Sequence, residues 1–413
     1  DTVVKENIVN TLLALLEDNE SSVRRRAAHA LGKLGNSSDT VVKENIVKAL
    51  LALLEHHNSD VRSSAASALG ELGNSSDTVV NALLALLQDN DSDVRSSAAR
   101  ALVQLGNSSD TVVNRLLPLL QDNESSVRSS AARALGELGN SSDTVVNGLL
   151  ALLQDNESFV RMMAADALVQ LGNSSDTVVK ENIVNGLLAL LQDNDSSVRW
   201  MAAHALGKLG NSSDTVVNGL LALLEDNESS VRWMAARALG ELGNSSETVV
   251  NALLALLEDN ESSVRRTAAR ALGELGNSSD TVVKALLALL EDNESDVRSS
   301  AADALGKLGN SSDTLVNRLL SLVEDNDSSV RSSAASALVQ LGNSSETVVK
   351  ALLALLQDND SFVPWMAARA LVELDKTSNH IIPSVIEWIE QHQASDYVGR
   401  GIDVLWDLVV GRE

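Results

Sequence analysis

The chain has 413 residues, a formal net charge of −25 and a sequence pI of about 4.6. Such an acidic chain is poorly suited to wholesale electrostatic binding of nucleic acid or of an anionic membrane. It contains no cysteine, which excludes a disulfide framework and a thiolate metal site. The sequence shows no signal peptide and no apolar run of transmembrane length, so we expect a soluble, cytoplasmic protein.

One sequence frame, V-R-x-x-A-A-x-A-L-x-x-L-G-N, returns along the chain. Its copies are 33 residues apart, except for two steps of 38 residues, and an eroded eleventh copy has Pro364 in place of the arginine. A fixed period in this range indicates a solenoid of stacked units. The ten intact copies begin at Val23, Val61, Val94, Val127, Val160, Val198, Val231, Val264, Val297 and Val330.

Each unit is predicted to contain two helices, A and B. Helix A is illustrated by residues 77–87, in which paired valines and leucines recur at three- and four-residue spacing. A polar turn at residues 88–91 then begins helix B, which ends at Leu105 before a left-handed Gly106. The connections are short, so the two helices are antiparallel. We interpret the Asn-Ser-Ser turns as caps of helix A rather than glycosylation acceptors.

Three features depart from the regular unit. Units 1, 2 and 6 carry five extra residues, which should lengthen helix A at its N-terminal end by about 7 Å. The lengthened edge of these helices is either a docking surface or a result of sequence divergence between the copies. Pro118, inside helix A of unit 4, is expected to remove a backbone hydrogen bond and bend the helix. Pro364 falls in the first turn of its helix, where a missing N–H has little effect.

The two ends of the array differ. Residues 1–374 form the repeats, and residues 375–413 are predicted to be C-terminal capping helices at 381–389 and 402–410. No such cap precedes unit 1, so we expect a fragment of a longer protein.

An apolar side of unit 1 is therefore left without a preceding repeat. It includes parts of Val4, Ile8, Leu12 and Leu15. An uncovered side of this kind invites fraying or association. We expect unit 1 either to be more mobile than the middle units or to be buried against another copy of the chain.

The frame arginine lies at the edge of the buried sector of helix B. A charge there must be paired or hydrogen-bonded. We predict a structural ladder in which each arginine binds carboxylates and carbonyls of its own turn or of the adjacent repeat. The ladder comprises Arg24, Arg62, Arg95, Arg128, Arg161, Arg199, Arg232, Arg265, Arg298 and Arg331.

The face of helix B opposite the Ala and Leu sector is where the copies differ. Five of the eleven copies have two serines there, whereas units 5 to 7 carry six large apolar side chains. An exposed apolar patch with Trp and Arg is typical of an interaction site; the alternative is burial against neighbouring B helices. The predicted binding residues are Met162, Met163, Trp200, Met201, His204, Trp233, Met234, Arg237, Arg266, Arg270, Trp365, Met366 and Arg369.

The same face holds eight arginines and two aspartates, a surplus of six positive charges in a strongly acidic chain. It should be electropositive relative to the rest of the surface. This favours a protein or peptide partner that is acidic or mixed apolar and acidic. The six histidines show no metal-ligand spacing, and no phosphate loop or nucleophile motif is present, so we predict no cofactor, no metal and no catalysis.

The motif V-R-x-x-A-A-x-A-L-G-x-L-G, preceded by an acidic turn, resembles the HEAT-like repeat of the phycobilisome-lyase type over residues 1–374. The resemblance implies an all-α, right-handed superhelical α-solenoid of about eleven two-helix repeats, with helix B on the concave side and a protein-binding function. Long arrays also resemble the C-terminal sensor regions of bacterial signalling ATPases of the NACHT or STAND type. A chromophore-lyase-like enzyme, nucleic-acid binding through the arginine-lined groove and an engineered consensus scaffold remain alternatives.

Overall fold

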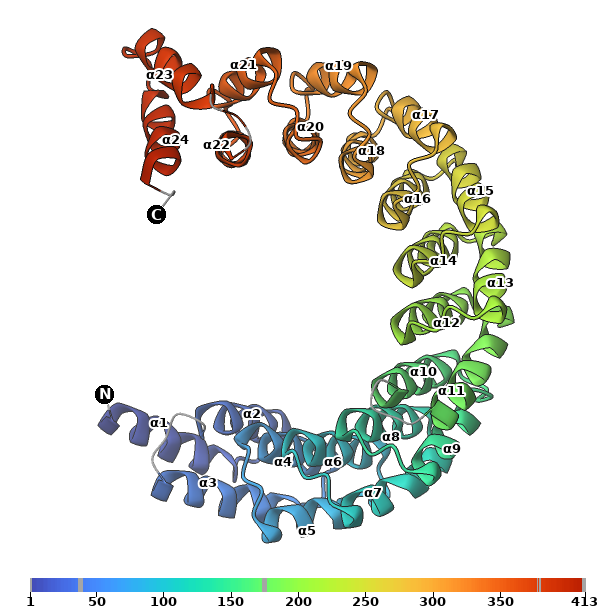
Figure 1. Ribbon diagram of the computed structural model, residues 1–413. Coiled ribbons are helices and arrows are strands. Elements are labelled where there is room, and N and C mark those ends of the chain that lie inside the picture. Colours follow the sequence, from blue (N-terminus) through green and yellow to red (C-terminus); the bar gives the residue numbers. More distant parts are fainter. Residues whose placement is uncertain (1, 36–39, 173–176, 377, 379, 411–413) are drawn as a thin grey trace. The chain divides into compact units, whose positions relative to one another are not determined.

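The computed structural model describes residues 2–35, 40–172, 177–376, 378 and 380–410, without the side chains of 2–6, 35, 40 and 41. The described residues are helical and include no strand. The chain divides into two compact units, Asp1–Leu209 and Gly210–Glu413. Each is a stack of antiparallel helix pairs (Figure 1), which confirms the all-α solenoid.

Odd-numbered helices are A helices and even-numbered helices are B helices, up to α22. Short 3-10 helices (η) continue four of the A helices. The first compact unit contains α1 (Thr2–Leu15), α2 (Ser21–Gly35), α3 (Thr40–Leu53), α4 (Ser59–Leu72), α5 (Asp77–Leu86), α6 (Ser92–Gln104), α7 (Asp110–Leu116), η1 (Leu117–Gln121), α8 (Ser125–Leu138), α9 (Asp143–Leu152), α10 (Ser158–Gly172), α11 (Thr177–Ala189), η2 (Leu190–Gln192) and α12 (Ser196–Leu209).

The second compact unit ends in two helices that lie outside the repeat pattern, α23 and α24. It contains α13 (Asp214–Ala222), η3 (Leu223–Glu225), α14 (Ser229–Leu242), α15 (Glu247–Ala255), η4 (Leu256–Glu258), α16 (Ser262–Leu275), α17 (Asp280–Leu289), α18 (Ser295–Leu308), α19 (Asp313–Leu322), α20 (Ser328–Gln340), α21 (Glu346–Leu355), α22 (Phe362–Asp375), α23 (Ile381–Gln391) and α24 (Val398–Val410).

The core lies between the A layer and the B layer. In α16, Val264, Ala268 and Leu272 are 0% exposed, as are their counterparts in the neighbouring B helices. Small alanines let adjacent B helices approach closely, and leucines fill the remaining space. In the second compact unit the A helices lie on the outer side of an arc and the B helices on its inner side (Figure 1).

The departures from the regular unit have local structural effects. The A helices with inserted residues are longer: α1 and α3 have 14 residues, against 10 in α5. Pro118 lies in η1, so α7 ends after 7 residues. The α-helical hydrogen bonds give way to a five-residue 3-10 segment, rather than only bending. Pro364 lies in the first turn of α22, as predicted.

The turns before the A helices differ from our expectation in most repeats, although the side chain of Ser312 does cap α19 by accepting from the N–H of Leu315. Ser76 precedes α5 but its side chain makes no capping hydrogen bond. Instead, the side-chain oxygen of Asn74 accepts from the backbone N–H of Ser76 at 3.0 Å, forming an Asx turn. The same turn recurs before most of the other A helices. Gly106 has φ 66°, so the predicted left-handed glycine is confirmed.

Frame arginines connect neighbouring repeats. Nε and Nη2 of Arg265 donate to the two carboxylate oxygens of Asp292 at 2.7 and 2.9 Å, and its Nη1 donates to the carbonyl of Asp259 at 2.9 Å. Both charged side chains are more than four-fifths buried. An aspartate of the following repeat also pairs with Arg62, Arg95, Arg128, Arg161, Arg232, Arg298 and Arg331.

Arg199 donates to the carbonyls of its own turn as the other ladder arginines do, to Asp193 at 2.8 Å and to Asn194 at 3.2 Å. Arg24 donates to the carbonyl of Asp18, but its buried Nε has no partner among the described residues. In the second repeat, the place of the ladder aspartate is taken by His56.

Both ends of the array show exposed apolar side chains. Ile8 of α1 is 43% exposed and Leu12 is half-buried; the side chain of Val4 is outside the described residues. At the other end, α23 and α24 form helices close to the predicted ranges. α24 buries Val404 and Leu408 but leaves Trp406 66% exposed.

Candidate recognition pocket on the B-helix face

The large apolar residues predicted to bind a partner are less exposed than expected. Met162, Met163, Trp200 and Met201 are half-buried in the first compact unit. In the second, Trp233 is half-buried and Met234 is only 1% exposed. Packing between adjacent B helices therefore covers much of the surface that these side chains were expected to present.

Other predicted residues are engaged within the chain. The rings of Trp200 and His204 stack at 5.6 Å between centroids. Met366 is half-buried, whereas Trp365 on α22 is 54% exposed. Arg369 lies with its guanidinium carbon 5.8 Å from the centre of the Trp365 ring.

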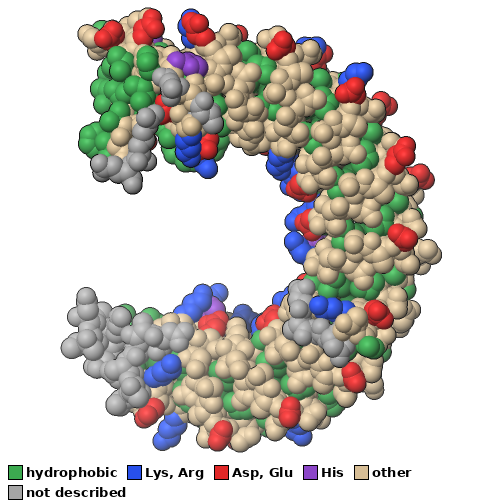
Figure 2. Space-filling view, viewed as in Figure 1, with side chains coloured by type: hydrophobic (Ala, Val, Ile, Leu, Met, Phe, Trp, Pro, Cys, Tyr) green, Lys and Arg blue, Asp and Glu red, His purple; other side chains and the backbone are tan. Residues whose placement is uncertain are grey.

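Carboxylates neutralise several of the B-face arginines. Arg237 donates to Glu241 at 2.8 Å, one helical turn away. Arg270 lies 3.6 Å from Glu274, and Arg266 lies 3.7 Å from Asp296 of the next repeat. Basic and acidic side chains accordingly alternate along the B side of the second compact unit (Figure 2). The surplus of positive charge inferred from the sequence is thus partly cancelled locally.

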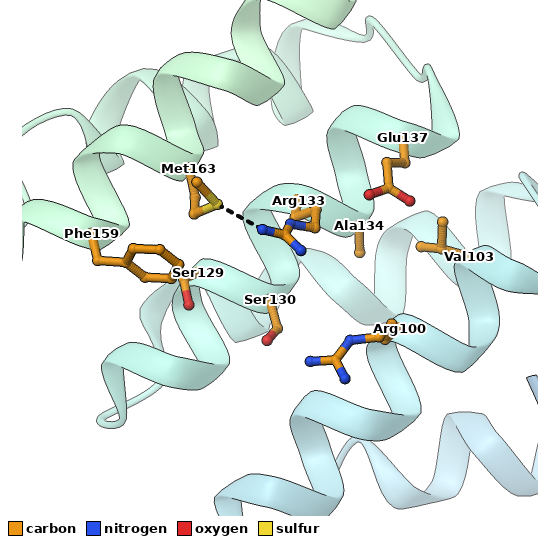
Figure 3. A pocket seen from close by; sticks show the side chains of 9 residues that line it. All are labelled: Arg100, Val103, Ser129, Ser130, Arg133, Ala134, Glu137, Phe159 and Met163. Carbon is orange, nitrogen blue, oxygen red and sulfur yellow. Dashed lines mark hydrogen bonds between the residues drawn. The ribbon is translucent and has the colours of Figure 1, made fainter. Parts of the chain in front are cut away.

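A pocket of about 120 Å³ opens on the B face of the first compact unit, across α6, α8 and α10. It has an apolar wall and a basic side (Figure 3). The sulfur of Met163 accepts a hydrogen bond from Nη2 of Arg133 at 3.3 Å, and Phe159 is 55% exposed. The lining residues are Arg100, Val103, Ser129, Ser130, Arg133, Ala134, Glu137, Phe159 and Met163.

Arg100, Arg133 and Glu137 are the charged groups that line this pocket. Both arginines are exposed, and neither forms an ion pair with a described carboxylate. Their guanidinium groups extend in the same direction, toward the side of Phe159 and Met163 (Figure 3). The residue one turn after Arg100 is Gln104, where every other repeat except those with Gln170 and Gln340 has glutamate or lysine. An uncharged amide cannot neutralise the arginine, so the cation remains available to a ligand.

A valine explains why the helices separate at this point. Most repeats have a buried glycine here: a Cβ on Gly70 would lie 2.8 Å from the Cα of Ala101, and a Cβ on Gly136 would lie 2.7 Å from the Cα of Ala167. Those distances leave no room for a side chain. Where Val103 replaces the glycine, α6 and α8 pack less closely than the glycine-bearing pairs of B helices. The gap between them forms the part of the pocket beside Val103 and Ala134.

Sequence reasoning missed Arg100, Arg133, Phe159 and Val103 as site residues. The signal was the dipeptide Val-Gln, which replaces the Gly-Glu or Gly-Lys of other copies. Its meaning depends on the neighbouring helix, because only the close approach of the next alanine makes glycine necessary.

The described residues offer little for metal or membrane chemistry. No group of three or more His, Cys, Asp or Glu side chains among them could hold a metal ion. Within the described ranges, no helix is long and apolar enough to cross a membrane.

Three solved structures share features with the chain. A crystal structure of importin beta is 17% identical with a TM-score of 0.68, covering 98% of this chain and 62% of that chain. Kap121p bound to the extreme C-terminus of the protein phosphatase Cdc14p is 17% identical with a TM-score of 0.59, covering 100% of this chain and 50% of that chain. At such identities the likeness shows the fold alone. An engineered protein is 28% identical over 81% of this chain and 99% of that chain, but its TM-score is 0.45.

Comparison with sequence-family models assigns the chain to a family more directly than the structural neighbours do. Among curated proteins, no sequence matches it. Models of the HEAT repeats match residues 250–339, 283–372 and 316–398. The model of the adaptin N terminal region matches residues 2–274. Because that match spans more than half of the sequence, the chain belongs to the adaptin N-terminal-region family of HEAT-repeat proteins.

Proposed function

We propose that the chain is a non-enzymatic recognition scaffold that binds an acidic, partly apolar peptide segment of a partner protein on its B-helix face. The observation that carries this proposal is the pair Arg100 and Arg133. Neither cation forms an ion pair with a carboxylate of the described residues, and both flank an apolar wall in a chain of net charge −25. Ligand carboxylates bind the guanidinium groups, and an apolar ligand side chain packs on Phe159 and Met163.

The fold supports a binding role. Stacked repeats present long continuous surfaces that suit extended segments of other proteins. Kap121p, which shares the fold, was crystallised with the end segment of a phosphatase. Met162, Trp200 and Met201, which are half-buried on the B face of the same compact unit, extend the proposed surface beyond the pocket.

Selection from a display library of random short peptides tests the proposal. Enriched peptides should combine Asp or Glu with Leu, Phe or Met, and their affinity should fall with added salt. Substituting Arg100→Glu together with Arg133→Glu should weaken binding at least about a hundredfold, since each charged hydrogen bond contributes about 1.5–3 kcal/mol. Melting temperature should change little, because both side chains are exposed.

Arg115→Glu is the matched control. Arg115 is exposed on α7, in the A layer of the repeat that also carries Arg133. This change gives the same shift in net charge per residue but should leave peptide affinity within about twofold. Enrichment of peptides without acidic residues would contradict the proposal. Tight binding of DNA with a steep salt dependence would instead favour the nucleic-acid alternative.

A further inference from the structure

A second pocket lies on the B face of the other compact unit, between α20 and α22. It encloses about 260 Å³, and a cavity of roughly 150 Å³ already takes a benzene ring. Its lining residues are Ser336, Val339, Gln340, Met366, Arg369, Ala370 and Glu373. One leucine or phenylalanine side chain of a ligand therefore fits.

Val339 opens this pocket in the same way as Val103 opens the first. In the preceding repeat the frame residue is Gly306, and a Cβ there would lie 2.8 Å from the Cα of Ala337. Val339 faces the corresponding Ala370, and α20 and α22 pack less closely than glycine-bearing pairs. The two pockets thus occupy equivalent positions in the repeat, and each is lined by the valine of a Val-Gln dipeptide.

Arg369 provides the positive charge at the pocket. Its neighbour one turn away, Glu373, pairs instead with Lys376 at 2.6 Å. Arg369 forms no ion pair with a described carboxylate and stacks over Trp365. Phe362 and Trp365 stack at 5.5 Å and are 55% and 54% exposed. An exposed aromatic pair beside a free guanidinium is the composition of a binding hot spot.

The third Val-Gln dipeptide shows that a valine alone does not make a binding site for an acidic ligand. Val169 separates α10 and α12, which also pack less closely than glycine-bearing pairs. Asp166 of that repeat stands where the first pocket has Arg100 and the second has Ser336. It accepts a hydrogen bond from Gln170 at 2.9 Å. A carboxylate at this place repels an acidic ligand. Valine therefore opens the gap, and arginine decides which ligand enters it.

We infer that the gap opened by Val339 is a second docking pocket, which takes an apolar side chain followed by a carboxylate in a short acidic segment of a partner protein. The inference rests on the proposed function, because it assigns the same ligand chemistry to a second place. Charge complementarity with Arg369 selects an acidic occupant, and the Phe362–Trp365 pair contacts the apolar residues beside it.

Methyl NMR of the methionines tests the two pockets separately in the full chain. Met163 lines the first pocket and Met366 lines the second, among only five methionines. The probe is the synthetic peptide acetyl-Glu-Glu-Phe-Glu-Glu-amide, with acetyl-Lys-Lys-Phe-Lys-Lys-amide as the charge-reversed control. The acidic peptide should shift the Met366 methyl signal in a saturable way, and the basic peptide should not.

Two variants connect the signal to the proposed groups. Arg369→Gln should weaken the Met366 response about tenfold or more. Val339→Gly should abolish the response by closing the gap, whereas Val169→Gly, the same exchange at the third Val-Gln dipeptide, should leave it unchanged. Circular dichroism checks that each variant folds, and Arg369→Gln remains decisive if Val339→Gly does not.

The outcomes separate the two proposals. If Met163 responds and Met366 does not, the second pocket is refuted and the proposed function stands. If only the Met366 signal responds, and this response depends on Arg369, the second pocket stands. The proposed role of Arg100 and Arg133 is then refuted. A Met366 shift of equal size with both peptides, or one insensitive to Arg369→Gln, overturns the inference. If neither methyl responds, both proposals are overturned.

Discussion

Arg400 donates from Nη1 to the backbone carbonyl of Asp358 at 3.0 Å, and to that of Leu356 at 2.7 Å. In a regular repeat the frame arginine donates to this same carbonyl, as Arg331 does to Asp325. The last repeat has Pro364 at that position. An arginine from α24, 36 residues further along the sequence, therefore supplies the missing donor and attaches the terminal helix to the array.

Replacement of Arg400 by Ala should detach α24 from the last repeat. The loss of charged hydrogen bonds to two partly buried carbonyls should cost about 1.5–3 kcal/mol locally. Hydrogen exchange should then increase in α23 and α24 before it increases in α16 or α18.

A second substitution, at Pro364, should partly reverse the effect of Arg400→Ala. The double variant Arg400→Ala with Pro364→Arg restores a frame arginine to the last repeat. It should recover protection of the turn at Asp358, though not of α24. Equal exchange rates in the single variant and the parent chain would show that Arg400 is dispensable.

Arg265 and Arg266 provide a matched test of the ladder. Arg265 is buried and lies 2.7 Å from Asp292, whereas Arg266 is about half exposed and lies 3.7 Å from Asp296. Removing one partner of a buried pair leaves an uncompensated charge, so Arg265→Ala should cost about 3–5 kcal/mol. Arg266→Ala should cost less than about 1 kcal/mol. Urea denaturation and hydrogen exchange measure both, and similar effects of the two changes would contradict the ladder role.

Acid should weaken the ladder. Hydrogen bonds from Arg265 and Arg331 hold the pKa of Asp292 and of Asp358, respectively, below the usual range. Because the folded pKa is lower than the unfolded one, the stabilisation is complete above about pH 4 and is lost as the pH falls through the folded value. Helical circular dichroism should therefore fall in that acidic range.

Asparagine variants identify the carboxylates responsible. Asp292→Asn removes a titrating group and should flatten the acid dependence of unfolding, besides lowering stability at neutral pH. Asp296→Asn makes the same charge change at an exposed position. It should reproduce the acid transition of the parent chain. If it flattens the transition equally, surface charge rather than the ladder governs acid unfolding.

His56 marks a defect in the ladder that one substitution should repair. Burial, together with the charges of His57 and Arg24, lowers the pKa of His56. Its Nδ1 accepts from the backbone N–H of Asn58 at 3.0 Å, as the ladder aspartates do from their own turns. His56→Asp should keep this turn and give the buried Nε of Arg24 a carboxylate partner. We expect a gain of about 1 kcal/mol in the first two repeats.

The pH dependence of the first two repeats should also change. With a lowered folded pKa, His56 contributes stability above its unfolded pKa of about 6.5 that is lost as the pH falls. The His56→Asp variant should lack this loss between about pH 7 and 5. Hydrogen exchange of α2 and α4 at both pH values checks it, with His57→Asp as the neighbouring control. A less stable variant would contradict the repair.

The repeat frame alone was sufficient to predict the helices and their pairing. The apolar period of three and four residues, a polar turn and a glycine specify each helix with local information. Pro118 and the inserted residues of units 1, 2 and 6 were interpretable for the same reason, since their effects act within one helix. The Asx turn at Asn74 was missed, because asparagine and serine both favour such turns and only the backbone geometry distinguishes them.

The tertiary structure decided what the variable face presents. Met234 is buried and Trp365 is exposed, although both occupy the variable positions of B helices. The sequence could not predict the role of Val103, because a glycine-to-valine exchange matters only where the next helix lies within contact distance. Nor could it show that Arg400 takes the place lost at Pro364. Such relations depend on distances between helices, and those distances are set by packing rather than by local sequence.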